Sequence, residues 1–184
     1  MKRTHLALLF AAAVAVGVLA ARCCMEKNSA LAIGTDRSGE YILTSGPVDG
    51  DVAATYFLDS STGIITATVL SNQRPGIQAV YKANILNDLT KWINFKKTGV
   101  NGQPLTLPEK PNYVMTTTTI DLRRSGNKLI PSYAPVHIVE TNTGIMLVYI
   151  IQWDRTKHSQ NIPVIAEMTP YTAEQINFVP KRDE

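Results

Sequence analysis

Residues 57–64, FLDSSTGI, and residues 138–145, IVETNTGI, are the two stretches of this sequence that decide its fold. Each holds two apolar residues, an acid, two polar residues, Thr, Gly and Ile in the same order. The acid can accept hydrogen bonds from backbone amides two or three residues further on, and glycine supplies the positive φ that closes a hairpin. Each stretch is therefore predicted to be a β-hairpin turn, and Asp59 and Glu140 are interpreted as structural rather than catalytic.

The two hairpins belong to a longer internal repeat. Residues 41–45, YILTS, are echoed 72 positions later by residues 113–117, YVMTT, whereas the hairpins are 81 positions apart. The difference fits a longer loop in the second copy, and a chance similarity of two common hairpins is the alternative. We expect repeat halves at about residues 40–82 and 112–168. Each is predicted to be a purely antiparallel meander, because short hairpin connections cannot span a parallel crossover.

The other elements follow from residue patterns. Runs rich in β-branched and aromatic residues, bounded by turn residues, predict strands. These runs lie at residues 41–44, 52–58, 64–70, 77–81, 113–117, 136–140, 145–153 and 162–166. Apolar residues at three- and four-residue spacing predict one helix over residues 83–93. The predicted fold class is mainly β, with two antiparallel meanders arranged as a sandwich or like propeller blades, one intervening helix, and an N-terminal hydrophobic helix.

Residues 1–24 are predicted to be a signal peptide or a signal anchor. Lys2 and Arg3 precede an uninterrupted apolar run from Leu6 to Ala21. As a helix this run spans roughly 24 Å, which is short for a bilayer core of about 30 Å but typical of a signal peptide. The positive charges favour an N-terminus in the cytoplasm. We therefore expect the domain to face the periplasm from the inner membrane, or to be secreted if the leader is cleaved.

Whether the leader is cleaved stays open at the level of sequence. Val18 and Ala20 fit the small-residue rule of a cleavage site, whereas Arg22 crowds that site and favours an uncleaved anchor. Residues 25–39 are polar and contain glycines, so they are predicted to be a tether. Residues 40–184 then form a single β-rich domain.

The charge distribution argues against nucleic-acid binding. The net charge is +3, but Lys2, Arg3 and Arg22 account for it, and the rest of the chain holds 15 basic and 15 acidic residues. A neutral domain lacks the basic surface that phosphate backbones require. We therefore expect no nucleic-acid partner.

No catalytic, cofactor or metal site is predicted. His158 follows Asp154 by four residues, a spacing that could orient an imidazole, but a solvated turn is the favoured interpretation. His137 lies in a strand pattern and is interpreted as a strand-face residue. A zinc site usually needs at least three protein ligands, and the two cysteines, Cys23 and Cys24, both lie in the leader.

Three further motifs are interpreted as loops. Residues 49–51, DGD, lack the remaining oxygen ligands of a calcium loop. Residues 34–40 have glycines spaced as in a phosphate-binding loop, but a glutamate stands where lysine is needed. Arg123 and Arg124 could bind an anion, although such a pair is normally a solvated loop.

Several segments resemble an uncharacterised family of N-terminally anchored planctomycete proteins of unknown function. The matching segments are residues 56–59 with 62–63, 70–73, 83–84 with 88–89, 111–116 and 139–144. The resemblance implies a lineage and a membrane-anchored location. It implies no activity, and no functional residue is carried over from it.

Two functions are therefore weighed for the domain. The first is a membrane-tethered extracytoplasmic binding or interaction module with a protein or glycan partner, in which weakly protected sheet edges favour a homo-oligomer. The alternative is an extracytoplasmic hydrolase that uses loop carboxylates and His158. A cleft of converging carboxylates would favour the hydrolase, and a flat or apolar groove would favour the module.

Overall fold

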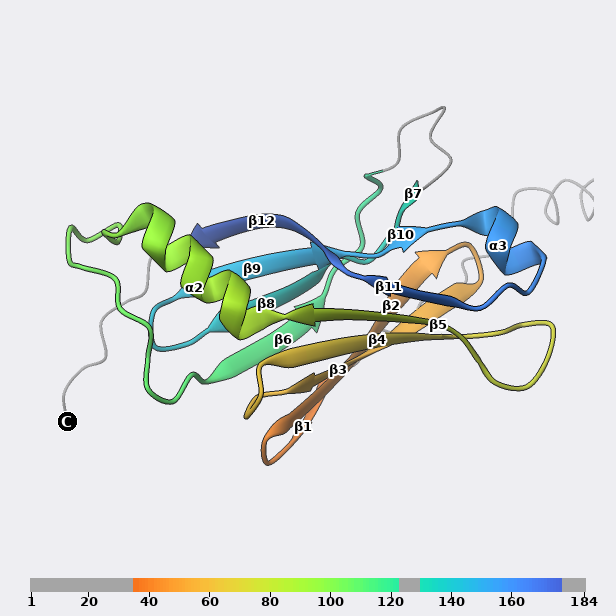
Figure 1. Ribbon diagram of the computed structural model, residues 1–184, viewed down its shortest axis with the longest axis horizontal. Helices are drawn as coiled ribbons and strands as arrows, with labels where there is room; N and C mark the ends of the chain where they lie inside the picture. Colours follow the sequence, from red (N-terminus) through yellow and green to blue (C-terminus); the bar gives the residue numbers. More distant parts are fainter. Residues whose placement is uncertain (1–34, 123–129, 177–184) are drawn as a thin grey trace, which may run out of the picture. The chain divides into compact units, whose positions relative to one another are not determined.

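The computed structural model describes residues 35–122 and 130–176. These residues are mainly β, as predicted, and form two larger sheets, one two-stranded sheet and two helices (Figure 1). Among them no helix is long and apolar enough to cross a membrane. The predicted leader, including Leu6 to Ala21, lies outside the described residues, as do Arg123 and Arg124.

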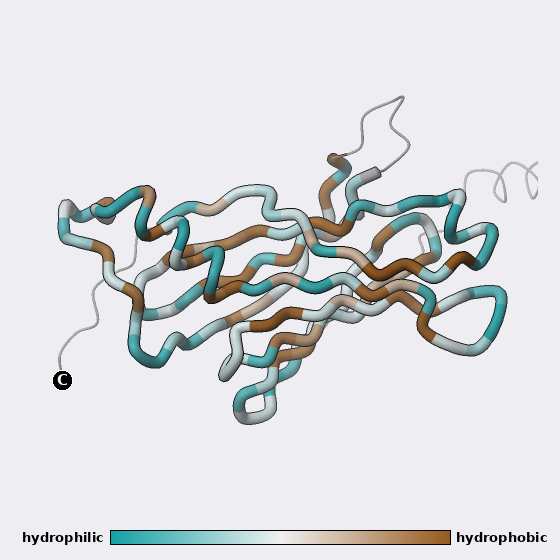
Figure 2. The backbone as a smooth tube through the Cα atoms, in the orientation of Figure 1, coloured by the Kyte–Doolittle hydropathy of each residue, from teal (hydrophilic) through white to brown (hydrophobic). Residues whose placement is uncertain are grey.

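The first sheet has six strands in the order β1-β2-β3-β4-β5-β11. Their bounds are β1 (Thr35–Ser38), β2 (Tyr41–Asp49), β3 (Val52–Asp59), β4 (Ile64–Leu70), β5 (Ile77–Asn84) and β11 (Val164–Glu167). Buried residues alternate with exposed ones along β3, as expected for a strand that buries one face. Figure 2 shows hydrophobic residues along the strands and mostly hydrophilic residues in the connecting loops. The helix α2 (Ile85–Lys96) follows β5 directly.

The second sheet has four strands in the order β12-β9-β8-β6. Their bounds are β6 (Tyr113–Thr117), β8 (Val136–Glu140), β9 (Ile145–Ile150) and β12 (Thr169–Gln175). A small pair is formed by β7 (Ile130–Pro131) and β10 (Gln152–Trp153), and the short helix α3 (Arg155–Ser159) follows β10. Buried residues from both larger sheets and from α2 form one hydrophobic cluster, so the sheets share a single core.

The two predicted hairpins have equivalent strand registers. In the first sheet Asp59 pairs with the first residue of β2 on one side and with the first residue of β4 on the other. In the second sheet Glu140 pairs in the same way with the first residues of β6 and β9. The two hairpins therefore occupy equivalent positions in two three-stranded meanders.

The turn chemistry of both hairpins is the predicted one. Asp59 accepts hydrogen bonds from the hydroxyl of Ser61 at 2.6 Å and from its amide at 2.9 Å, and these bonds lower the pKa of Asp59. Glu140 accepts hydrogen bonds from the amides of Asn142 at 3.1 Å and Thr143 at 2.8 Å. The glycine that closes each turn has a φ of 68° or 71°. Both acids are therefore structural residues of a turn.

The prediction of purely antiparallel pairing is wrong at one place. β11 runs parallel to β5, with Val164 opposite Ala79. The crossover rule does not exclude this pairing, because the connection from β5 to β11 is no hairpin but passes through the whole second meander. The run at residues 162–166 was expected to close the second half, and β11 instead joins the first sheet. The chain then continues as β12, which pairs antiparallel with β9.

Two element boundaries also differ from expectation. Thr35–Ser38, which we placed in a tether, forms strand β1 and pairs antiparallel with β2, so the tether prediction is wrong for these four residues. The helix expected from residue 83 begins at Ile85, because β5 continues through Asn84. The side chain of Asn84 accepts a hydrogen bond from the Asn87 amide and so caps the helix.

Buried tyrosines predict the alkaline limit of stability. Burial, which removes water from the phenol groups, raises the pKa of Tyr81 and Tyr113 to about 12. It also raises the pKa of Tyr56 and Tyr149. An unfolded tyrosine ionises near pH 10, so the folded state favours the neutral phenols. We expect stability to be fully retained below pH 10 and lost as the pH rises toward 12. Phenolate absorbance should rise together with the loss of near-ultraviolet circular dichroism, and ionisation of all tyrosines near pH 10 in a folded chain would contradict this.

Candidate functional site

A groove lies between helix α2 and strand β12. The cavity measures about 430 Å³, and its walls include four aromatic residues, Trp92, Phe95, Tyr149 and Tyr171. Phe95 is 80% exposed and Tyr171 is 55% exposed, although both are large apolar groups. Two exposed aromatic side chains that line one cavity are typical of a binding surface rather than of a structural position.

Helix α2 is held so that one of its faces lines the groove. Its residues Ile85, Leu89 and Ile93 are buried in the core. The indole N–H of Trp92 donates a hydrogen bond to the carbonyl of Ala173 at 2.9 Å, which ties the helix to β12. Since β12 is itself paired with β9, both walls of the groove are anchored to the second sheet.

A compensated charge pair lies at one end of the groove. The carboxylate of Asp88 accepts hydrogen bonds from the Tyr149 hydroxyl at 2.9 Å and from the Lys91 ammonium at 3.1 Å. Burial, followed by the neighbouring Asp88 carboxylate, raises the pKa of Tyr149, which therefore donates as a neutral phenol. The pair offers hydrogen-bond donors and acceptors to a ligand without a net charge.

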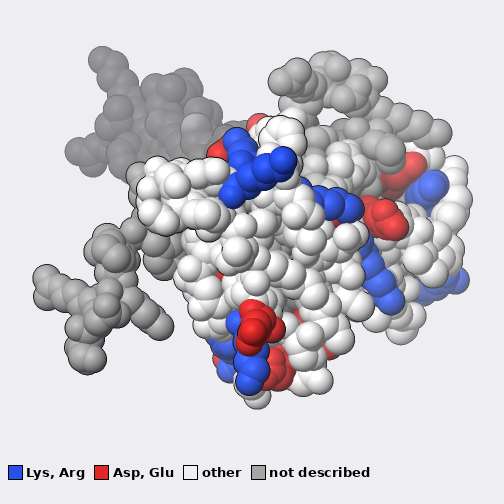
Figure 3. Space-filling model, turned by 60° about the vertical axis from the view of Figure 1, so that its left-hand side comes forward, with Lys and Arg blue, Asp and Glu red and all other residues white. Residues whose placement is uncertain are grey.

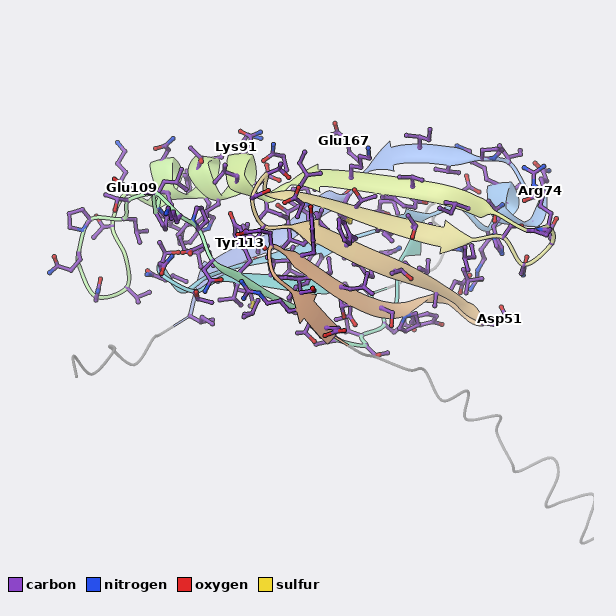
Figure 4. All side chains as sticks on the ribbon, turned by 90° about the horizontal axis from the view of Figure 1, so that it is seen from below. Asp51, Arg74, Lys91, Glu109, Tyr113 and Glu167 are labelled. Carbon is purple, nitrogen blue, oxygen red and sulfur yellow. The ribbon has the colours of Figure 1, made fainter. Side chains whose placement is uncertain are left out.

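A second cavity of about 450 Å³ continues the groove toward β5 and β11. It shares Asp88, Lys91 and Pro170 with the first cavity. Its other polar lining includes Lys82 and Glu167. Lys91 on α2 and Glu167 on β11 project to the same side of the domain (Figure 4). Together the two cavities form an elongated groove, which we call the α2–β12 groove.

The groove is built by the segments that follow the two three-stranded meanders. The first meander is followed by β5 and α2, and the second is followed by β10, α3 and the β11–β12 segment. β11 lies beside β5, and β12 lies beside α2. The surface seen in Figure 3 carries basic and acidic groups interspersed with uncharged side chains.

The side chains of Asp154 and His158, which lie four residues apart in the sequence, do not pair with each other. Asp154 caps α3 by accepting hydrogen bonds from the amides of Thr156 and Lys157. The Nδ1 atom of His158 contacts the side-chain oxygen of Gln78, and its ring centre is 4.9 Å from that of Trp153. His158 is thus half-buried rather than fully solvated as we expected, and it does not line either cavity of the groove.

The remaining candidate residues have structural positions. His137 lies on β8 in contact with the Thr118 hydroxyl at 2.9 Å, and burial lowers its pKa. The segment 49–51 lies at the turn from β2 to β3, where the Asp49 carboxylate accepts hydrogen bonds from Nε and Nη2 of Arg155. No group of three or more His, Cys, Asp or Glu residues that could hold a metal ion occurs in residues 35–122 and 130–176.

Sequence reasoning did not find the groove. Tyr171 lies in β12, whose sequence TPYTAEQ has a proline and few β-branched apolar residues, so no strand was predicted there. Phe95 lies beyond the predicted end of the helix. The available signal was an aromatic residue, Phe95, just beyond the apolar stripe of that helix.

Comparisons of this chain with protein-family models, with curated proteins and with solved structures gave no match.

Proposed function

We propose that this protein is a membrane-tethered extracytoplasmic binding module that holds an uncharged glycan in the α2–β12 groove. The observation that carries the proposal is the pairing of exposed aromatic side chains, Phe95 and Tyr171, with the charge-compensated Asp88–Lys91 pair.

The chemistry of a sugar matches these two features. A sugar ring has an apolar C–H face that packs against an aromatic ring, and hydroxyl groups at its edge that donate and accept hydrogen bonds. Phe95 and Tyr171 supply aromatic surface, and Asp88 and Lys91 supply an acceptor and a donor. Because the pair is compensated, a neutral ligand leaves no charge unpaired, whereas an anionic or cationic ligand gains no net attraction.

An extracytoplasmic hydrolase is the alternative. Asp88 and Glu167 both line the second cavity, which is the observation in its favour. The Asp88 carboxylate, however, already accepts hydrogen bonds from Tyr149 and Lys91. The expected partner, His158 on α3, contacts the side chain of Gln78 instead. These contacts favour binding over cleavage, and the appearance of shortened products from a bound oligosaccharide would reverse that preference.

The binding proposal is tested with a panel of uncharged oligosaccharides, first on an array and then by calorimetry with the full chain. We expect Phe95→Ala and Tyr171→Ala each to weaken binding by about three- to tenfold, because each removes an aromatic contact of roughly 0.5–1.5 kcal/mol. Phe57→Ala is the matched control, since Phe57 is a 41% exposed aromatic residue on β3 outside the groove. Equal losses in all three variants, or no binding to any neutral glycan, would contradict the proposal.

The tethering part of the proposal is supported by the sequence. It uses Leu6 to Ala21 as the membrane segment, with Lys2 and Arg3 on the cytoplasmic side. The resemblance to N-terminally anchored planctomycete proteins favours the same location. We expect protease added to spheroplasts to digest residues 40–184 of the membrane-bound chain. Protection of these residues, with digestion only after lysis, would place the domain in the cytoplasm instead.

A further inference from the structure

One edge of the six-stranded sheet is left open by the described part of the chain. β11 is the last strand of that sheet and pairs on one side only, with β5. The amide of Met168 donates to the carbonyl of Lys82 at 2.9 Å. The backbone groups of Met168 therefore face β5. Because backbone N–H and C=O groups alternate in direction along a strand, those of Ile165 and Glu167 point away from β5. No backbone partner for these groups occurs within residues 35–122 and 130–176.

The other edges are more strongly protected than β11, whose four residues carry a single charge, that of Glu167. β1 carries Asp36 and Arg37 among its four residues, and charged side chains discourage strand pairing. β12 is covered by α2 through the hydrogen bond of Trp92. At β6, the hydroxyl of Thr117 donates to the carbonyl of Ser45 on β2 at 2.7 Å.

The open edge also carries an exposed aliphatic side chain. Ile165 is 86% exposed, and its neighbour across the pair is Val80. An unpaired strand with isoleucine at its centre is a surface that other chains pair with.

We propose that β11 pairs antiparallel with β11 of a second copy of this chain, around a two-fold axis at Ile165. A two-fold interface uses the same patch on both copies. An antiparallel pair of two β11 strands meets this condition, because the outward N–H and C=O groups of one Ile165 match those of the other. The two Ile165 residues then exchange both backbone hydrogen bonds and lie side by side.

The flanking residues fit this register. Glu167 comes to lie opposite Pro163 of the second copy, so the two Glu167 carboxylates lie about 13 Å apart and do not repel each other strongly. Pro163 has no N–H and ends the hydrogen-bond ladder there. Ile165 and Val80 of each copy lie at the centre of the interface and supply its apolar part.

The test is disulfide formation in the full chain within membranes. Ile165→Cys is introduced in a Cys23→Ser, Cys24→Ser background, which removes both native cysteines. Hydrogen-bonded antiparallel pairs have Cα atoms about 5.5 Å apart, within the range of a disulfide. We expect mild oxidation to give a covalent dimer. Leu43→Cys is the matched control, because Leu43 is 44% exposed on β2, away from the β11 edge, and should stay monomeric.

A second variant uses a non-covalent readout. Ile165→Lys places two like charges at the two-fold axis, and we expect it to halve the mass of the detergent-solubilised full chain measured by light scattering. Leu43→Lys should leave the mass unchanged. Three results would each overturn the proposal. They are cross-linking of Ile165→Cys no faster than that of Leu43→Cys, cross-linking to a different protein, and a wild-type chain that is monomeric.

Discussion

Replacing Glu140 with alanine is expected to lower the free energy of unfolding by about 3–5 kcal/mol. The carboxylate is only 1% exposed, and it accepts hydrogen bonds from three backbone amides. These belong to Asn112, Asn142 and Thr143, so Glu140 joins its own turn to the segment before β6. The variant leaves these donors without an acceptor in a place that water reaches poorly, and each unsatisfied donor costs about 1–3 kcal/mol.

The repeat supplies a matched control for this prediction. Asp59 holds the equivalent position in the first hairpin and makes the same kind of turn bonds, but its carboxylate accepts them at the surface. In Asp59→Ala, water replaces the lost acceptor, and the effect should be much smaller. Urea unfolding of both variants, followed by near-ultraviolet circular dichroism, gives the comparison. Equal destabilisation would mean that burial of Glu140 is not what makes it important.

Leu89→Ala is expected to cost about 2–5 kcal/mol, the range for a fully buried leucine. Leu89 is 0% exposed and lies at the centre of the buried face of α2, between Ile85 and Ile93. The missing methyl groups leave a cavity between the helix and the shared core, and alanine's higher helix propensity does not compensate for it.

A control for the helix lies on its other face. Phe95→Ala removes a larger side chain from the same helix, but Phe95 is 80% exposed, so stability should change little. Thermal unfolding of the two variants separates these expectations. If Phe95→Ala destabilised the chain as much as Leu89→Ala, Phe95 would belong to the core and not to a ligand groove.

The sequence predicted those parts of the fold that depend on neighbouring residues. The turn at Asp59 follows from an acid and a glycine four positions apart, and its repetition at Glu140 identified two equivalent meanders. Helix α2 was visible because Ile85, Leu89 and Ile93 recur at helical spacing. Each of these signals is contained in a short stretch of chain.

The rest depends on contacts between distant segments. β11 joins β5 across the entire second meander, and nothing within residues 162–166 distinguishes that partner from β9. β12 is a strand because β9 offers it a paired edge, despite the proline in its sequence. The groove exists only where α2 and β12 meet, so Phe95 and Tyr171 could not be brought together from their positions in the chain.

The tryptophan fluorescence of the chain reports on ligand binding in the groove. The sequence has two tryptophans, of which Trp153 is 2% exposed in the core and Trp92 lines the groove. A ligand that enters the groove changes the surroundings of Trp92 and leaves Trp153 as a constant reference.

The most direct test of the glycan groove is therefore a fluorescence titration with the oligosaccharide that binds most tightly on the array. We expect a saturable change in emission with the same midpoint as calorimetry, and no change in a Trp92→Phe variant. Saturable binding by calorimetry without any change in emission, or an emission change that persists in Trp92→Phe, would show that the ligand binds elsewhere and would contradict the account.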